Sequence, residues 1–244
     1  MNIFLNLLKT ELKLSLRGID MIIFAIIMPA VITIIIGILP NAPIYGGNTL
    51  LEQSIGAISS ISICAGGVMG LPLLISDYRH KKILKRFHVT PVSPSVILLV
   101  HIAVYTIYSV VSLIVIYLIS SGIFGIYIKG SWIKFIIIFF IVMLSIFSVG
   151  MMIGGTSPNI KTASIIASLL YFPMLIFSGA TLPYEIMPKA LQMVSDIMPL
   201  TQGIKLLKAV FLGNQLDGLF YSWAYLLILV IVCSTVSIKF FKWE

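Results

Sequence analysis

Long apolar runs recur along this chain, and they limit its possible folds more than any other feature. Each run approaches or exceeds about 18 residues, the length at which a helix crosses the roughly 30 Å hydrocarbon layer of a bilayer. Charged residues make up only 10% of the chain, and the mean hydropathy is +1.13. These values lie outside the range of soluble domains. The sequence therefore predicts an all-α polytopic membrane protein.

Six of these runs are predicted transmembrane helices within one transmembrane domain, residues 1–244. They cover residues 21–40, 54–76, 95–119, 133–154, 163–178 and 219–238. The first run is longer than the apolar part of a cleavable signal peptide, so we expect it to be retained as a span. Six spans place the N- and C-termini on the same side of the membrane.

The basic residues fall unevenly between the two sides that six spans define. Eleven of the 16 lie on the side of the termini. Positive charge concentrates in cytoplasmic loops, so both termini are predicted to be cytoplasmic. The net charge of +8 would also suit nucleic acid, but the basic residues lie in short segments beside apolar runs, as expected for contact with anionic lipid. We expect membrane lipid, and no nucleic acid, as a partner.

Residues 1–20 have the spacing of an amphipathic helix. Lys9, Lys13 and Arg17 recur every four residues and share one helical face, while apolar side chains lie roughly opposite. Glu11 interrupts the pattern because it falls among the apolar positions. The segment is predicted to be an interfacial helix, and a simple positive flank that fixes the topology remains the alternative.

Residues 77–94, DYRHKKILKRFHVTPVSP, form the most basic segment of the chain. Five basic residues fall within its first ten positions, between the second and third predicted spans. A helix through Tyr78, Lys82, Lys85 and Arg86 would present these side chains on one face, and Thr90-Pro91 would end it. The segment is predicted either to dock on another protein or to act only as a topology signal.

Residues 179–217 differ from the rest because they are too polar to span. Apolar positions recur with helical spacing between Met187 and Met198, and again between Leu200 and Phe211. The prolines at 183, 188 and 199 separate these stretches. The segment is therefore predicted to be an external, re-entrant hairpin of two short amphipathic helices that dips into or lies on the membrane face.

Chemistry-bearing motifs are scarce in this sequence. No Gly-Lys dipeptide occurs, so the chain has no P-loop and no means of its own to hydrolyse ATP in that way. All eight carboxylates lie at chain ends or in loops, which argues against an ion-coupled secondary transporter. His101 is the one ionisable residue expected within a span, and we expect a neutral, hydrogen-bonded side chain. No catalytic site, metal site or cofactor is predicted for this chain.

Two stretches resemble bacterial ABC transporters of the ABC-2 family, whose membrane subunits are six-span permeases. One is the 77–94 segment, and the other is FSGATLPYEIMPKALQMVSDIMPLTQGIKLLKAVFLG, whose prolines occur in the order typical of that family. The resemblance extends over essentially the whole chain. It departs from the common form at His80 and Lys82, where an acidic residue and a glycine are frequent.

The resemblance implies several functional assignments. It implies that the 77–94 segment is a cytoplasmic coupling helix. The residues expected to contact a separate ABC ATPase subunit are Arg79, Lys82, Leu84, Lys85 and Phe87. Lys9, Lys13 and Arg17 belong to the interfacial helix, and Pro183, Glu185, Pro188 and Pro199 to the external hairpin. ATP and Mg²⁺ are held by the partner subunit, and a second permease chain, identical or different, completes the membrane unit.

The expected function is export of an amphipathic or hydrophobic substrate, such as a drug, an antimicrobial peptide or a lipid-like molecule, across the bacterial cytoplasmic membrane. An ATP-independent scaffold or channel, or a secondary transporter, remains as an alternative at this point.

Overall fold

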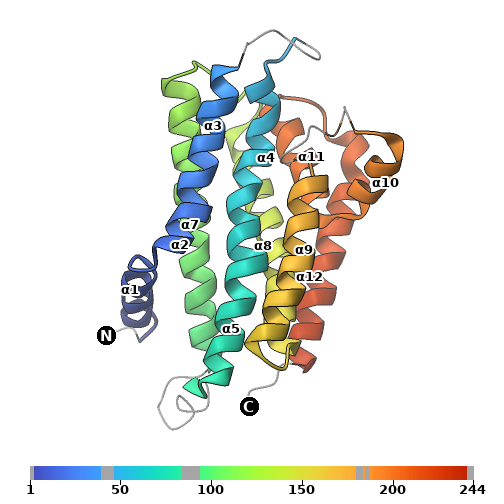
Figure 1. Ribbon diagram of the computed structural model, residues 1–244. Coiled ribbons are helices and arrows are strands. Elements are labelled where there is room, and N and C mark those ends of the chain that lie inside the picture. The colour runs from blue at the N-terminus through green and yellow to red at the C-terminus, as the bar shows by residue number, and fades with distance from the viewer. Residues whose placement is uncertain (1–2, 40–46, 84–93, 180–183, 185–186, 241–244) are drawn as a thin grey trace.

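The computed structural model describes residues 3–39, 47–83, 94–179, 184 and 187–240, and over these residues the chain is helical with no strand (Figure 1). The helices follow one another in a simple bundle. In chain order they are α1 (Ile3–Ser15), α2 (Ile19–Ile22), η1 (Ile23–Ile27), α3 (Met28–Ile38), α4 (Leu50–Cys64), η2 (Ala65–Gly70), α5 (Leu71–His80), α7 (Pro94–Gly122), α8 (Trp132–Thr156), α9 (Ile160–Phe177), α10 (Lys189–Ile197), α11 (Pro199–Phe211), η4 (Asp217–Leu219) and α12 (Phe220–Phe240).

Five helices within the described residues are long and apolar enough to cross a membrane. They are Leu50–His80, Val96–Gly122, Trp132–Thr156, Ile160–Phe177 and Phe220–Phe240. This confirms an all-α polytopic membrane protein. The first predicted span yields a shorter apolar helix, Ile23–Ile38, which rises about 24 Å, somewhat less than the hydrocarbon layer. The count of six spans therefore stays a prediction.

The second span is longer than the sequence pattern suggested. α4, the π-helical η2 and α5 form one helix of 31 residues, Leu50–His80, where residues 54–76 were expected. Thr49 starts it with a capping box: its hydroxyl accepts from the Glu52 backbone N–H at 3.2 Å, and the Glu52 carboxylate accepts from the Thr49 N–H at 2.7 Å. The helix is about 46 Å long, so at least one end extends beyond the hydrocarbon layer.

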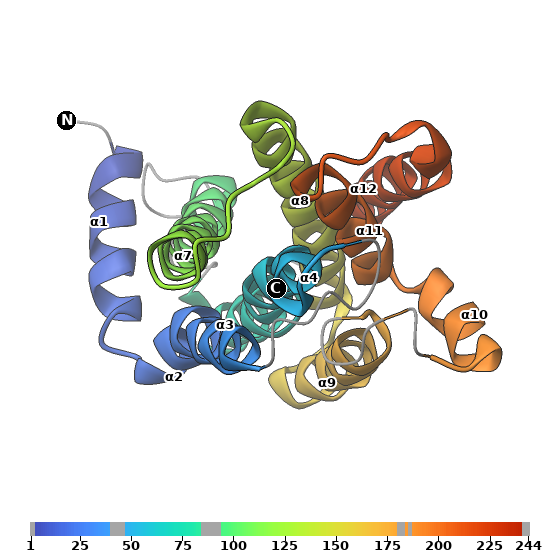
Figure 2. The same cartoon turned by 90° about the horizontal axis from the view of Figure 1, so that it is seen from above.

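This long helix is the centre of the bundle, with α3, α7, α8, α9 and α11 around it (Figure 2). Of its most apolar stretch 83% is buried, against 17% for α12, so α12 lies at the periphery. Small residues allow the close packing. A Cβ added at Gly150 of α8 would lie 1.8 Å from the carbonyl oxygen of Gly67. A Cβ added at Gly56 would lie 2.8 Å from the backbone nitrogen of Lys208 in α11.

We expect Gly150→Ala to destabilise the folded protein by about 1–3 kcal/mol, the usual range for overpacking. The added methyl would meet the Gly67 backbone, which has no flexible side chain to move aside. The measurement is the thermal unfolding midpoint of the purified protein in detergent. Gly122→Ala is the matched control, because nothing lies within 4 Å of a Cβ at that position. Equal midpoints for the two variants would contradict the close approach of η2 and α8.

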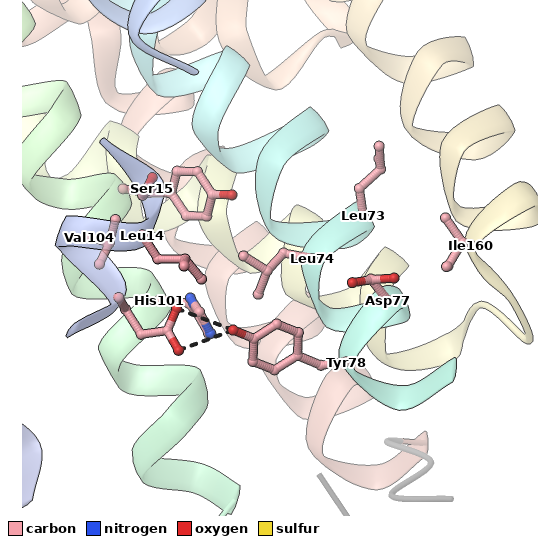
Figure 3. A pocket seen from close by; sticks show the side chains of 11 residues that line it. Leu14, Ser15, Leu73, Leu74, Asp77, Tyr78, His101, Val104 and Ile160 are labelled. Atoms are coloured by element: carbon pink, nitrogen blue, oxygen red, sulfur yellow. Dashed lines mark hydrogen bonds between the residues drawn. The ribbon is translucent and has the colours of Figure 1, made fainter. Parts of the chain in front are cut away.

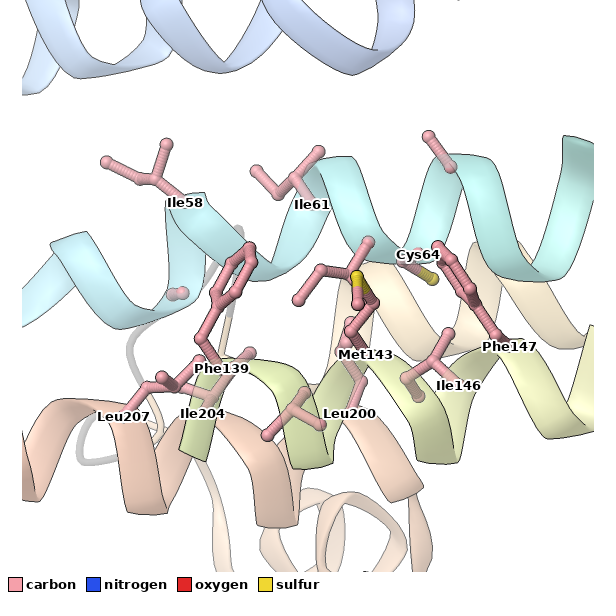
Figure 4. Packing of buried hydrophobic residues seen from close by; sticks show 14 of the residues in the cluster. Ile58, Ile61, Cys64, Phe139, Met143, Ile146, Phe147, Leu200, Ile204 and Leu207 are labelled. Atoms are coloured by element: carbon pink, nitrogen blue, oxygen red, sulfur yellow. The ribbon is translucent and has the colours of Figure 1, made fainter. Parts of the chain in front are cut away.

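One continuous core cluster surrounds α4. Phe139 of α8 and Leu200 and Leu207 of α11 lie on one side of α4, and Ile58 and Ile61 project from its other side (Figure 4). The two predicted amphipathic helices are both present, but α10 has only Ser195 buried, whereas α11 lies inside the bundle. It is buried on nearly all sides, because it fills the space that α4, α8 and α12 leave at this end.

The two ends of the bundle carry different groups. We call the end with α1, the His80 end of α5, the 157–159 turn and the Phe240 end of α12 the basic end. We call the end with residues 123–131, α10 and α11 the hairpin end (Figure 1). Helix direction assigns each described basic residue to one end. Lys9, Lys13, Arg17, Arg79, Lys81, Lys82, Lys161 and Lys239 lie at the basic end, and Lys129, Lys134, Lys189, Lys205 and Lys208 at the hairpin end.

Candidate functional site

Helix α5 ends at the basic end in a tight turn. The Lys82 N–H donates to the Arg79 carbonyl at 2.9 Å, and Lys82 has a left-handed backbone, φ +54°. That conformation ends a helix, so the expected continuous face from Tyr78 through Lys82 to Arg86 is wrong. Lys81 and Lys82 are exposed. Three further predicted contact residues, Leu84, Lys85 and Phe87, lie outside the described residues.

Arg79 points back into the bundle from this turn. Its side chain is only 6% exposed, and Nη1 donates to the Gly155 carbonyl oxygen at 3.0 Å. Gly155 lies in the last turn of α8, where carbonyl groups lack partners within the helix and carry a partial negative charge. The guanidinium therefore joins the end of α5 to the end of α8, and its predicted contact with a partner stays a prediction.

Helix α1 is held to the bundle by two tyrosines. The Tyr78 hydroxyl of α5 donates to both carboxylate oxygens of Glu11, at 3.1 and 3.2 Å, and the Tyr108 hydroxyl of α7 donates to Ser15 at 2.9 Å. Lys9 and Lys13 are exposed on α1. Arg17 is exposed as well but follows the helix, which ends at Ser15 and not at residue 20, because the Arg17 and Gly18 N–H groups close a turn there.

Glu11 was the one break in the amphipathic pattern of α1, and the structure explains it. The carboxylate faces the bundle and needs a donor there, which Tyr78 supplies. Burial raises the pKa of the Glu11 carboxyl above its usual range, and the Tyr78 hydrogen bond acts in the opposite direction. A lone carboxylate among apolar helix positions was the available signal for this contact.

A cavity of about 420 Å³ lies beside this contact, between α1, α5, α7 and the first residue of α9 (Figure 3). His101 of α7 is on its wall and is only 2% exposed. Its ring meets the Tyr78 ring edge to face, with centroids 4.9 Å apart. The expected buried histidine is present, but its Nε2 makes no hydrogen bond within the described part of the chain.

The hairpin end contains a second polar cluster, centred on Asp196 at the end of α10. Asp196 accepts from the Tyr184 hydroxyl at 3.1 Å and pairs with Lys205 of α11 at 2.5 Å. The Lys205 ammonium also lies 4.4 Å from the centre of the Tyr184 ring. These contacts join the segment before α10 to both hairpin helices. Sequence reasoning named the prolines of this segment and missed the cluster.

Two of the four predicted hairpin residues lie in the described part of the chain. Pro188 immediately precedes α10, and Pro199 is the first residue of α11, the position where a missing N–H costs nothing. Pro183 and Glu185 lie outside the described residues.

Buried polar groups also secure α11. Gln202 is only 1% exposed, and its amide donates to the Asp196 carbonyl at 2.6 Å and accepts from Ser222 of α12 at 2.7 Å. Lys129 joins the 123–131 connection to α4 through a 2.7 Å pair with Glu52. The hairpin end is therefore a fixed part of the bundle.

The described residues contain no group of three His, Cys, Asp or Glu side chains that could hold a metal ion. Cys64 and Cys233 are free thiols, and both are buried. The contacts at the two ends thus organise helices, and none of them has the geometry of a metal-dependent catalytic centre.

Comparison with known proteins assigns the bundle. A family model described as ABC-2 type transporter matches residues 3–212, from α1 through α11. The chain belongs to the ABC-2 transporter family. Nodulation protein J of Rhizobium leguminosarum bv. viciae is 29% identical to it over 94 residues, which is 38% of this chain and 36% of that protein's length.

As an ABC-2 permease, the chain is a membrane component of a transport system and a multi-pass protein of the bacterial plasma membrane. In this ABC-2 protein the charged and polar groups at the basic end differ in accessibility. The Lys81–Lys82 turn is exposed, whereas Arg79 and the Glu11–Tyr78 contact are used within the chain.

Proposed function

We propose that this chain is the transmembrane subunit of an ATP-driven exporter. A separate ATPase subunit, which holds ATP and Mg²⁺, would supply the energy, and a second permease chain would complete the membrane unit. The substrate would be amphipathic or hydrophobic: a drug, an antimicrobial peptide or a lipid-like molecule. The basic end would then face the cytoplasm, as the excess of basic residues there favours.

The observation that carries this proposal is the way the central helix ends. Leu50–His80 is buried through most of its length and terminates in the exposed Lys81–Lys82 turn. A partner seated on that turn would act directly on the helix that contacts most of the others. A channel or scaffold has no need for such an exposed extension of its core helix.

Displacement of this turn would also reach other helices. Arg79 connects the turn to α8 through its hydrogen bond to Gly155, and Tyr78 connects it to α1 through its hydrogen bond to Glu11. Packed helices transmit displacement as rigid elements. The basic end therefore combines an accessible docking point with contacts to both sides of the bundle.

Reconstitution tests the proposed function. The partner to test would be an ATPase that carries a P-loop motif and is encoded by a neighbouring gene. We expect the chain alone to hydrolyse no ATP, since it has no P-loop. The two proteins should co-purify, and a fluorescent amphipathic dye should move across liposomes only when ATP is added on the ATPase side. Dye movement without ATP would favour a channel, and failure to co-purify would refute the ATPase partnership.

The same liposomes test the orientation of the chain in the membrane. A thiol introduced by Lys189→Cys, on the exposed start of α10, should react with an impermeant maleimide from the side opposite the ATPase. Lys82→Cys should react from the ATPase side. Both native thiols are buried, so background labelling should be low. Labelling of both positions from one side would contradict the topology.

A further inference from the structure

The cavity between α1 and the bundle has the size of a ligand site. Its volume of about 420 Å³ lies within the range of roughly 300–1,000 Å³ that small-molecule sites occupy. α1 forms one wall, α5 and α7 form others, and Ile160 at the start of α9 lies at its edge (Figure 3).

The walls of this cavity are mainly apolar, with acidic groups at defined places. Leu14, Leu73 and Leu74 supply apolar surface, and the rings of Tyr78 and Tyr105 face the same space. Glu11 and Asp77 are the carboxylates on its wall. No lysine or arginine is among the lining residues, so the charge that the cavity presents is negative.

The imidazole of His101 has a nitrogen without a hydrogen-bonding partner on the cavity wall. The side chain is almost fully buried on the cavity wall, and its Nε2 has no partner among the described residues. Buried polar atoms without partners are rare, because leaving one unpaired costs about 1–3 kcal/mol. A neutral imidazole nitrogen can accept a hydrogen bond from a charged donor.

We propose that this cavity binds an amphipathic amine, with the ammonium group between Glu11 and His101 and the apolar part against the leucines of α1 and α5. Tyrosine rings add to the attraction of a cation. The amine has two possible sources, an aminophospholipid headgroup or a free lipophilic amine. This site goes beyond the proposed function and does not depend on it, because binding needs no ATPase subunit.

The surrounding charges agree with a cationic ligand. Lys81 pairs with Asp77 at 2.7 Å, but its side chain is 60% exposed, so the pair is weak and can adjust. Lys9 and Lys13 are exposed on α1 and are not part of the cavity wall. The Glu11 carboxylate already accepts a hydrogen bond from the Tyr78 hydroxyl. An ammonium group would add a full positive charge beside this partly buried negative charge, and so offset the cost of burying it.

The test measures binding of a dansyl-labelled alkylamine to the purified full chain in phosphatidylcholine nanodiscs. The matched probe carries a terminal hydroxyl in place of the amine. We expect saturable binding of the amine and at least tenfold weaker binding of the hydroxyl probe, since charge-assisted hydrogen bonds are lost. Equal binding of the two probes would overturn the proposal.

Glu11→Gln removes the charge and keeps an acceptor for Tyr78, so α1 should stay docked while amine affinity falls at least tenfold. Asn6→Lys changes the net charge by the same amount on an exposed position of α1 and should leave affinity unchanged. His101→Phe keeps an aromatic ring against Tyr78 and should weaken the amine about fivefold. Unchanged affinity in both cavity variants would refute the site.

Competition identifies the source of the amine. If phosphatidylethanolamine added to the nanodiscs displaces the probe, the headgroup of that lipid is the ligand. If it does not, while soluble lipophilic amines do, the site takes a free amine. Displacement by neutral amphiphiles as effectively as by amines would overturn the assignment of a cationic ligand.

Discussion

Reversing the charge of Lys82 and Lys85 together should release the ATPase subunit and abolish ATP-driven transport. Lys82 is exposed just beyond α5, and the resemblance to ABC-2 permeases assigns both lysines to the ATPase contact. Like charges opposed across an interface cost several kcal/mol. We therefore expect a loss of affinity of about 100-fold or more, measured by titrating the ATPase onto the permease in nanodiscs.

The matched control reverses two lysines at the other end of the bundle. Lys134 and Lys189 are exposed at the hairpin end, and their double replacement by Glu makes the same change in net charge. We expect normal ATPase affinity for that variant. Unfolding midpoints of both variants should match the wild type, because Lys82, Lys134 and Lys189 are exposed and such lysines contribute little to stability. A charge-reversed basic turn that still binds the ATPase and transports would refute the docking role.

Arg79→Ala should separate transport from binding of the ATPase. The side chain is buried and donates to Gly155 of α8, so its loss would uncouple the end of α5 from the end of α8 without altering the exposed turn. We expect transport to fall at least about tenfold, the effect of losing one positioning contact, with ATPase affinity unchanged. Transport rate and affinity are measured in the same liposomes.

Two further variants test whether Arg79 acts through its hydrogen bond to α8. Arg79→Lys keeps the charge but loses the planar guanidinium, and it should restore part of the transport. Lys81→Ala removes an exposed pair with Asp77 and should have little effect, because such pairs contribute less than about 1 kcal/mol. If Arg79→Ala lowers ATPase affinity as strongly as the charge reversal, Arg79 contacts the partner and the α5–α8 link is secondary.

Much of the architecture followed from the sequence alone. Apolar runs predicted the helical membrane fold, and the spans 95–119, 133–154, 163–178 and 219–238 lie within three residues of the observed helix bounds. The periodicity placed the polar hairpin helices correctly between the last two spans. These features depend on local hydropathy and on helix period, which a sequence records directly.

The sequence was less informative where several helices meet. It placed Tyr78 and Lys82 on one helix face, but the left-handed backbone at Lys82 ends the helix before such a face forms. It assigned Arg79 to a partner contact and could not show that Gly155, 76 positions away, accepts its hydrogen bond. It predicted two amphipathic helices that dip into or lie on the membrane face, and it could not show that helices α4, α8 and α12 pack against α11. The placement of Arg79 and of α11 depends on neighbours that are distant in sequence, whereas the turn at Lys82 is closed locally by Arg79.

The long apolar runs by themselves determined that this chain is a helical membrane protein, because burying apolar surface in a bilayer requires every backbone group to be paired within its own helix. The proline and basic motifs determined the family resemblance. Only the tertiary structure decided which helix lies at the centre and which charges face inward. Glu11, Arg79 and His101 occupy their places because Tyr78, Gly155 and the cavity beside α1 are brought to them by packing.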